Sequence, residues 1–119
     1  MILKEGTVRI EGRLLKNILK IFTLMLTCTG LHLAEIEERK LTTSQNIIRN
    51  TKKEYKIRDI LQIYRHKSKP NVYIVDHVTR RLVIHTDTET ERDQWINCII
   101  EQMVRNSPAT FVPDNVLFF

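Results

Sequence analysis

Cysteine, glycine and proline are scarce in this chain of 119 residues, which contains two, three and three of them. The two cysteines, Cys28 and Cys98, lie far apart, and neither has a second cysteine or histidine at zinc-ligand spacing, which excludes the usual zinc patterns. We expect two reduced, mostly buried thiols, with a disulfide bridge as the alternative. Three glycines in total leave no Gly-rich loop of the kind that cradles a nucleotide phosphate.

Long apolar runs are also missing. The longest, residues 21–26, is interrupted by Thr23 and is far shorter than the roughly 20 residues that span a membrane as a helix. Lys4, Glu5 and Arg9 interrupt the beginning of the chain where a signal peptide would have its apolar core. We therefore expect a soluble protein in the cytoplasm.

The residues that commonly carry catalysis do not form a catalytic pattern. The four histidines (His32, His66, His77 and His85) show no metal-ligand spacing, and no nucleophile has a base nearby in the sequence. We expect no enzymatic activity, no metal site and no cofactor.

Length and composition indicate one globular domain. Typical domains run to roughly 100 to 200 residues, and the 42% apolar and 28% charged residues are ordinary for a folded chain. A chain of this size buries roughly two thirds of its unfolded surface, enough for a core without disulfides or metal.

The net charge of +5 is unevenly distributed. Residues 49–69 contain eight basic and two acidic side chains, whereas residues 87–101 contain five acidic and one basic. Such a polarised surface steers its positive end toward anionic lipid, nucleic acid or an acidic partner. A solvated basic loop is the alternative interpretation.

Short apolar alternations separated by turn residues predict a mostly β fold. Residues 37–53 are polar and are expected to form a long mobile connection. Seven strands this short indicate a sandwich or a partly open barrel. The strands are expected at residues 9–16, 20–27, 31–36, 55–58, 61–65, 72–76 and 82–85.

The periodicity changes near residue 88. Thr88 and Glu91 form a capping-box pattern, in which each side chain satisfies a free backbone N–H at a helix start. Trp95, Ile99 and Met103 then recur every four residues, so an amphipathic helix is expected over residues 88–104. Trp95 should plug the open end of the sheet and is not expected to bind a ligand.

Three motifs carry a resemblance to the pleckstrin homology (PH) domain. Residues 11–16, EGRLLK, are similar to the first-strand pattern of that family, and residues 24–31, LMLTCTGL, to the end of its second strand. Residues 88–96 match the S/T-x-x-E-x-x-x-W-I of its final helix. The resemblance implies a seven-stranded partly open barrel capped by a C-terminal helix. We expect a lead-in at 1–8, a PH-like domain at 9–105 and an apolar tail at 106–119.

Family members that hold phosphoinositides use a basic pattern over the first two strands. Lys16 and Lys20 match its first two positions, but Phe22 stands where the family has an arginine, and the connecting loop is short. Because each phosphate needs several charge-assisted hydrogen bonds, tight binding of a trisphosphorylated headgroup is not expected.

The same hairpin tip carries two aliphatic side chains, Ile18 and Leu19, flanked by lysines. These residues either enter the headgroup boundary of a membrane or fold back onto the sheet. Burying one such side chain is worth roughly 1.5–3 kcal/mol.

The resemblance also places the loop between the fifth and sixth strands near this hairpin. It implies a shallow basic rim suited to phosphatidic acid or a phosphoinositide with few phosphates, as in the acylated PH proteins that sense phosphatidic acid, whose lipid attachment would lie upstream. Lys52, Lys53 and Lys56 either extend the rim or form a solvated face. The rim residues are Lys16, Lys20, Arg65, His66, Lys67 and Lys69.

Peripheral membrane docking on anionic lipid is therefore the expected function. The main alternative is a PH-fold interaction module that binds a peptide or small GTPase between the fifth strand and the helix, which exposed apolar residues along 60–63 or 111–119 would favour. Nucleic acid is not the expected partner, because only Tyr55 and Tyr64 lie near the basic residues and both fit a strand.

Overall fold

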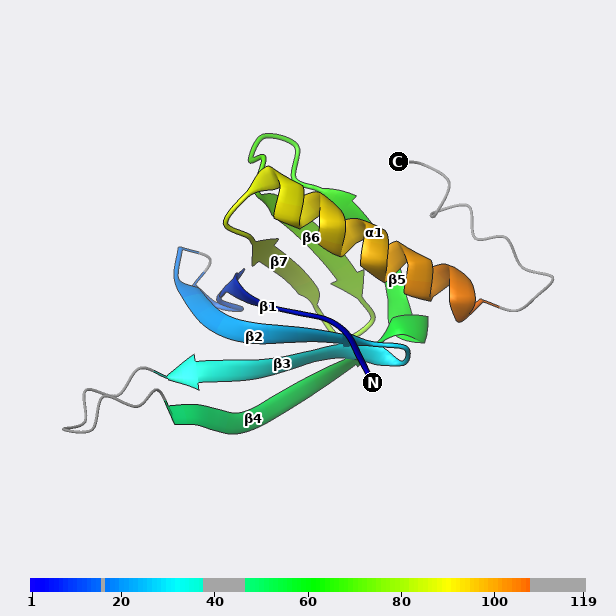
Figure 1. Cartoon of the computed structure of the whole chain (residues 1–119). Coiled ribbons are helices and arrows are strands. Elements are labelled where there is room, and N and C mark those ends of the chain that lie inside the picture. The colour runs from blue at the N-terminus through cyan, green and yellow to red at the C-terminus, as the bar shows by residue number, and fades with distance from the viewer. Residues whose placement is uncertain (16, 38–46, 108–119) are drawn as a thin grey trace.

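The structure is a computed structural model and describes residues 1–15, 17–37 and 47–107. Seven antiparallel strands form one sheet in the order β4-β3-β2-β1-β7-β6-β5, and one C-terminal helix packs against it (Figure 1). The sheet does not close on itself, because β4 and β5 remain its two edges. The elements are β1 (Ile2–Glu11), β2 (Leu19–Thr27), β3 (Gly30–Glu37), β4 (Ile47–Lys56), a 3-10 turn (Ile57–Asp59), β5 (Ile60–Arg65), β6 (Val72–His77), β7 (Arg81–His85) and α1 (Glu89–Arg105).

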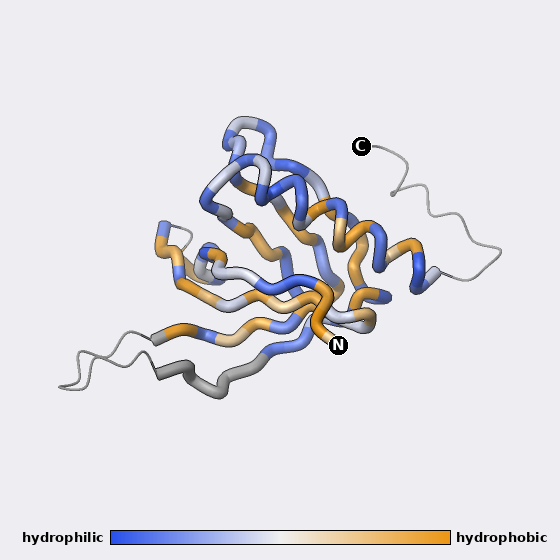
Figure 2. Tube along the Cα trace, viewed as in Figure 1, coloured by the Kyte–Doolittle hydropathy of each residue, from blue (hydrophilic) through white to orange (hydrophobic). Residues whose placement is uncertain are grey.

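The two halves of the sheet meet only along a short stretch of β1. Arg9 and Ile10 pair with β7, whereas β1 pairs with β2 along almost its whole length. Helix α1 covers the gap that this leaves and buries Trp95 completely, as expected for a plug. A Cβ at Gly6 would stand 3.3 Å from Trp95 Cζ2, so a glycine allows β1 to approach the indole closely. Alternating residues of both halves form one core with this tryptophan (Figure 2).

The helix begins as the sequence predicts. Thr88 is the N-cap, and its hydroxyl accepts a hydrogen bond from the backbone N–H of Glu91 at 3.1 Å. The Glu91 carboxylate accepts in return from the N–H of Asp87 at 3.4 Å. The expected end at Val104 is one residue short of the observed Arg105.

The first strand starts earlier than predicted. The residues expected to form a lead-in belong to β1, which ends at Glu11 and not at Lys16. Lys4 and Gly6 occupy inward positions against Trp95, and the Lys4 ammonium lies 5.0 Å from the ring centroid. Because neither residue is apolar in the usual way of an inward strand position, the sequence shows no apolar alternation in this part of β1. The chain turns after Gly12, where the N–H donates to the carbonyl of Ile18.

The position predicted for the fourth strand is wrong. The expected connection over residues 37–53 is strand β4 from Ile47 onward, and the strand predicted at 55–58 is its end plus the 3-10 turn. An edge strand pairs on one side only and can carry many polar side chains, so its composition resembles that of a loop. Residues 38–46 lie outside the described part of the chain.

Both cysteines are free, but the expectation that both are buried is wrong. Cys28 is exposed in the β2–β3 turn, and Cys98 on α1 is half-buried. Across the described residues, no helix combines the length and hydropathy needed to cross a bilayer.

Candidate functional site

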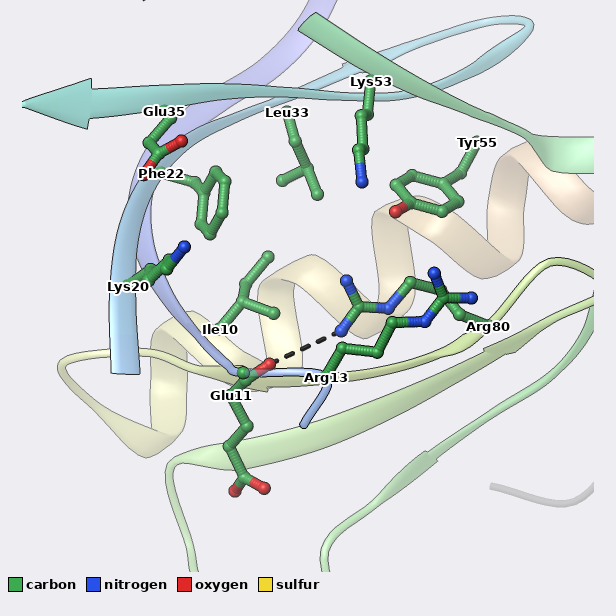
Figure 3. A pocket seen from close by; sticks show the side chains of 11 residues that line it. Ile10, Glu11, Arg13, Lys20, Phe22, Leu33, Glu35, Lys53, Tyr55 and Arg80 are labelled. Atoms are coloured by element: carbon green, nitrogen blue, oxygen red, sulfur yellow. Dashed lines mark hydrogen bonds between the residues drawn. The ribbon is translucent and has the colours of Figure 1, made fainter. Parts of the chain in front are cut away.

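A hollow of about 240 Å³ opens on the concave face of the sheet, at the end where β1 finishes and β2 begins (Figure 3). We call this hollow the mouth of the open barrel. Strands β1, β2, β3 and β4 end or begin around it, and the β6–β7 turn closes one side. Its lining comprises Ile10, Glu11, Gly12, Arg13, Lys20, Phe22, Leu33, Glu35, Lys53, Tyr55 and Arg80.

The strand period explains why charged residues face this hollow. Residues of β2 alternate, so the face that buries Leu24 also carries Phe22 and Lys20 toward the mouth. On β4, Lys53 lies on the same face as the buried Tyr55, and it pairs with Leu33 of β3. The apolar concave face thus becomes cationic at its open end.

Two arginines from turns complete the mouth. Arg13 follows Gly12 in the β1–β2 loop and donates to the carbonyl of Thr79 at 3.5 Å. Arg80 follows Thr79 in the β6–β7 turn and donates through Nη2 to the carbonyl of Glu11 at 3.5 Å. Each turn therefore reaches across to the other through an arginine.

The Nε atom of Arg80 is buried and has no hydrogen-bond partner. A buried donor without a partner costs about 1–3 kcal/mol. The same guanidinium contacts the carbonyl of Glu11 through Nη2 at 3.5 Å, which is long for a hydrogen bond. Arg80 is thus held in the mouth at an energetic cost.

His77 anchors the turn that carries Arg80. Its Nδ1 accepts from the N–H of Thr79 at 3.2 Å, so the ring proton is on Nε2, which lies 3.0 Å from the carbonyl of Lys56. The ring also packs edge-on against Tyr55, with centroids 5.2 Å apart. The turn is thereby fixed to the end of β4, on the same strand as Lys53.

The charges of the mouth are unbalanced. Within the described part of the chain, ion pairs engage Arg9, Arg65, Arg81, Arg92 and Arg105 but none of the four cations that line the hollow. The carboxylate of Glu11 turns away and meets His85 at 3.0 Å (Figure 3). The unpaired cations are Arg13, Lys20, Lys53 and Arg80.

A second hollow of about 530 Å³ lies on the outer face of β6 and β7. It shares Glu11, Gly12, Arg13 and Arg80 with the first, so these residues form a wall between the two. Its far side contains Arg81, whose Nε donates to Asp76 at 2.6 Å.

Asp76 illustrates how the second hollow differs from the mouth. Partial burial raises the pKa of its carboxyl, but hydrogen bonds from Arg81 and Gln62 outweigh that effect and hold the pKa below its usual value. Arg81 already has its anion and is less available to a ligand than Arg80.

His66 also lines the second hollow, and its backbone environment occupies one of its ring nitrogens. Its Nδ1 accepts from the N–H groups of Ser68 at 3.2 Å and Lys69 at 3.1 Å. Nδ1 is thereby occupied as an acceptor, which leaves Nε2 as the ring nitrogen available to a ligand. The sequence interpretation treated it as a weak cation.

The structure distributes the predicted rim over several places. Lys20 lines the mouth, and His66 lines the second hollow together with Arg13. Arg65 is 3.2 Å from Asp93 in an ion pair. The other predicted cations, Lys67 and Lys69, are exposed in the β5–β6 turn and line neither hollow.

Lys16 lies outside the described residues, whereas the structure describes the aliphatic residues of the same loop. Ile18 and Leu19 are 44% and 40% exposed beside the mouth. Two residues that the sequence did not single out are more exposed: Leu14 at 92% and Leu15 at 58%.

Sequence reasoning missed Arg13 and Arg80 and left Lys53 open. The available signal was positional: each arginine stands within a turn next to a strand end, where a side chain can reach the mouth of a barrel. What the sequence did not provide was the contact between the two turns, which joins residues 13 and 79.

No family model matches the sequence, and no curated protein matches it. Solved structures do. The chain is similar to the N-terminal PH domain of human ARAP2, with a TM-score of 0.67 and 16% identity over 92% of this chain and 86% of that one. It is also similar to the Slm1 PH domain in complex with phosphoserine, with a TM-score of 0.64 and 13% identity over 87% and 96%.

A third similar structure is a complex of the PDZ-RhoGEF DH/PH domains with activated RhoA. The TM-score is 0.68 at 13% identity, over 89% of this chain but only 30% of that longer one. At these identities the likeness concerns the fold alone. With seven strands in an open sheet and a capping helix carrying a buried tryptophan, this chain has the fold of a PH domain.

Proposed function

We propose that this chain is a non-catalytic docking module that binds the headgroup phosphate of an anionic phospholipid in the mouth of its barrel. The ligand class is phosphatidic acid or a phosphoinositide with few phosphates. The observation that carries the proposal is the set of four cations, Arg13, Lys20, Lys53 and Arg80, that surround one hollow without a carboxylate partner among the described residues.

A phosphate would supply oxygen acceptors to the arginine donors that line this hollow. Arginine donors form strong charge-assisted hydrogen bonds to phosphate oxygens, often two at once. Arg80 has a buried Nε with no partner, and Arg13 has only a long bond to a carbonyl. Both guanidinium groups face the same hollow, so one phosphate can accept from both. The Slm1 PH domain, which has a similar fold, was solved in complex with phosphoserine, a phosphate-bearing ligand.

A lipid is favoured over a soluble phosphate because apolar side chains surround the mouth. Leu14 and Leu15 follow directly after Arg13, and Ile18 and Leu19 complete the loop. Each aliphatic side chain that enters the acyl boundary gains roughly 1.5–3 kcal/mol. The loop would thus insert while the neighbouring arginine meets the headgroup.

The remaining predicted cations are proposed to act at longer range. Lys67 and Lys69 are exposed and stand outside both hollows, next to His66 in the β5–β6 turn. A basic residue near an anionic leaflet contributes about 1 kcal/mol without a specific contact. Arg65 contributes less, because Asp93 offsets its charge.

The competing function, binding of a peptide or small GTPase, is less favoured by the described surface. On β5, Ile60 and Ile63 are buried in the core, and Leu61 is the exposed member at 59%. This is not the continuous apolar stripe that an interaction groove needs. The apolar residues 111–119 lie outside the described part.

Vesicle co-sedimentation over a range of salt concentrations tests the proposal. The intact chain should bind vesicles containing phosphatidic acid and not vesicles of neutral lipid alone, with affinity falling steeply as salt rises. The double variant Lys20→Glu with Lys53→Glu should lose this binding.

The double variant Lys67→Glu with Lys69→Glu is the matched control, because it changes the net charge equally. It should weaken binding only partly. Equal losses in the two variants would mean that overall charge and not the hollow determines binding, and no preference for anionic vesicles would favour a protein partner.

A further inference from the structure

Two glutamates, Glu11 and Glu35, line the cationic mouth. Glu35 is half-buried on β3, where it pairs with Phe22 of β2 on the concave face. Among the described residues it has no ion-pair or hydrogen-bond partner in the side chains around it. Glu11 also lines the hollow, but its carboxylate turns outward to His85.

Glu35 makes the two ends of the hollow unequal. Figure 3 shows it beside Phe22 and Lys20, on the opposite side from the guanidinium groups of Arg13 and Arg80. Lys53 and the Tyr55 ring lie toward the arginine end. One end therefore concentrates positive charge, while the other carries the negative charge of Glu35, which forms no ion pair with Lys20.

This asymmetry limits how many phosphates the hollow accepts. A first phosphate at the Arg13 and Arg80 end meets only cations. A second phosphate on the same headgroup would extend along the hollow toward Glu35 and meet a fixed negative charge. Like charges a few ångströms apart at a partly buried site repel strongly, because the effective dielectric constant there is about 20 and not 80.

We propose that Glu35 is a specificity-determining residue, which rejects headgroups carrying more than one ring phosphate in favour of those with a single phosphate. The proposal rests on the docking function proposed above and names the residue that sets its ligand range. Specificity of this kind comes from a repulsive element as much as from attractive ones.

The test compares two lipids for the intact chain and for Glu35→Gln, a change that keeps shape and removes charge. Vesicles contain either phosphatidic acid or phosphatidylinositol 4,5-bisphosphate, matched for surface charge. Glu35→Gln should raise affinity for the bisphosphate about tenfold and for phosphatidic acid by about twofold or less. Thermal unfolding of each variant verifies that the fold is intact.

Glu5→Gln is the matched control. Glu5 is exposed near the beginning of β1, away from the mouth, and the substitution changes net charge by the same amount. It should shift both affinities slightly and equally.

The outcomes separate the two proposals. If the intact chain binds both anionic vesicles and Glu35→Gln shifts both affinities by the same factor as Glu5→Gln, Glu35 contributes only general charge and its assigned role is overturned, while the docking function stands. If the intact chain does not distinguish anionic from neutral vesicles, the docking function is overturned and the role of Glu35 with it.

Discussion

Replacing Arg80 by methionine should weaken binding to anionic vesicles while leaving the fold as stable as before or slightly more stable. Most substitutions of a partly buried residue destabilise a protein. Arg80 differs because its Nε is buried without a partner and its Nη2 contact to the Glu11 carbonyl is long, at 3.5 Å. Methionine keeps most of the apolar stem and removes the unsatisfied donor.

The magnitudes follow from these contacts. A hydrogen bond to a charged group contributes about 1.5–3 kcal/mol, so losing the guanidinium on a phosphate should lower affinity about 10- to 100-fold. A buried unpaired donor destabilises the fold by about 1–3 kcal/mol, so removing the Nε should stabilise it by part of that amount. The loss of the long hydrogen bond to Glu11 cancels some of this stabilisation. We therefore expect the free energy of unfolding to stay constant or rise by about 1 kcal/mol.

Vesicle co-sedimentation measures the affinity, and urea unfolding of the same samples measures the free energy of unfolding. Arg105→Met is the matched control, since Arg105 pairs with Glu101 on exposed α1 and lies away from the mouth; it should change neither affinity nor stability appreciably. A variant at position 80 that binds as well as the original chain would refute the assigned role of Arg80. One that unfolds several kcal/mol more easily would show that Arg80 is instead a structural residue.

The remaining predictions address the loop, the plug and one carboxylate. Ile18→Ser with Leu19→Ser should lower vesicle affinity and leave its salt dependence nearly unchanged, because these side chains contribute apolar area and no charge; a steeper or flatter salt slope would contradict this. Trp95→Ala should lower the free energy of unfolding by about 3–5 kcal/mol in denaturant titrations, since a fully buried indole leaves a cavity under α1. The pKa of Asp76 is lowered in the folded chain, so its contribution to stability is complete above about pH 4 and is lost as the pH falls through the lowered value. Asp76→Asn should therefore flatten the acid limb of unfolding free energy against pH, and an unchanged limb would show that other carboxylates cause it.

The sequence predicted elements whose signals are local. The capping pattern at Thr88 and the four-residue spacing from Trp95 located α1 to within one residue, because both depend on contacts within one helix. The central strands β6 and β7 were also found to within one residue at each end. β7 alternates between buried and more exposed residues, whereas β6 is buried at five of its six positions.

The elements that sequence reasoning misplaced depend on distant partners. Strand β1 was shifted because its inward Lys4 and Gly6 pack against Trp95, which lies far along the chain. Strand β4 resembled a loop because it is an edge strand. β1 is thus explained by a neighbour that only the folded chain brings close, and β4 by its place at the edge of the sheet, and neither is visible in the local sequence.

The same distinction explains which part of the site could be predicted. Basic residues concentrated in the sequence, as in residues 65–69, attract attention, yet Arg65 is already paired with Asp93. The two arginines that line the mouth come singly from two turns, Arg13 from one and Arg80 from the other, and each contacts the backbone of the opposite turn. A cation is available to a ligand when no carboxylate forms an ion pair with it. For Arg13 and Arg80 this depends on the contact between the β1–β2 loop and the β6–β7 turn and not on the density of charge in the sequence. The pairing of β1 with β7 at Arg9 and Ile10, at the end of β1, brings those turns together. The contact that joins the two halves of the sheet therefore also positions the hollow that we propose as the phosphate site.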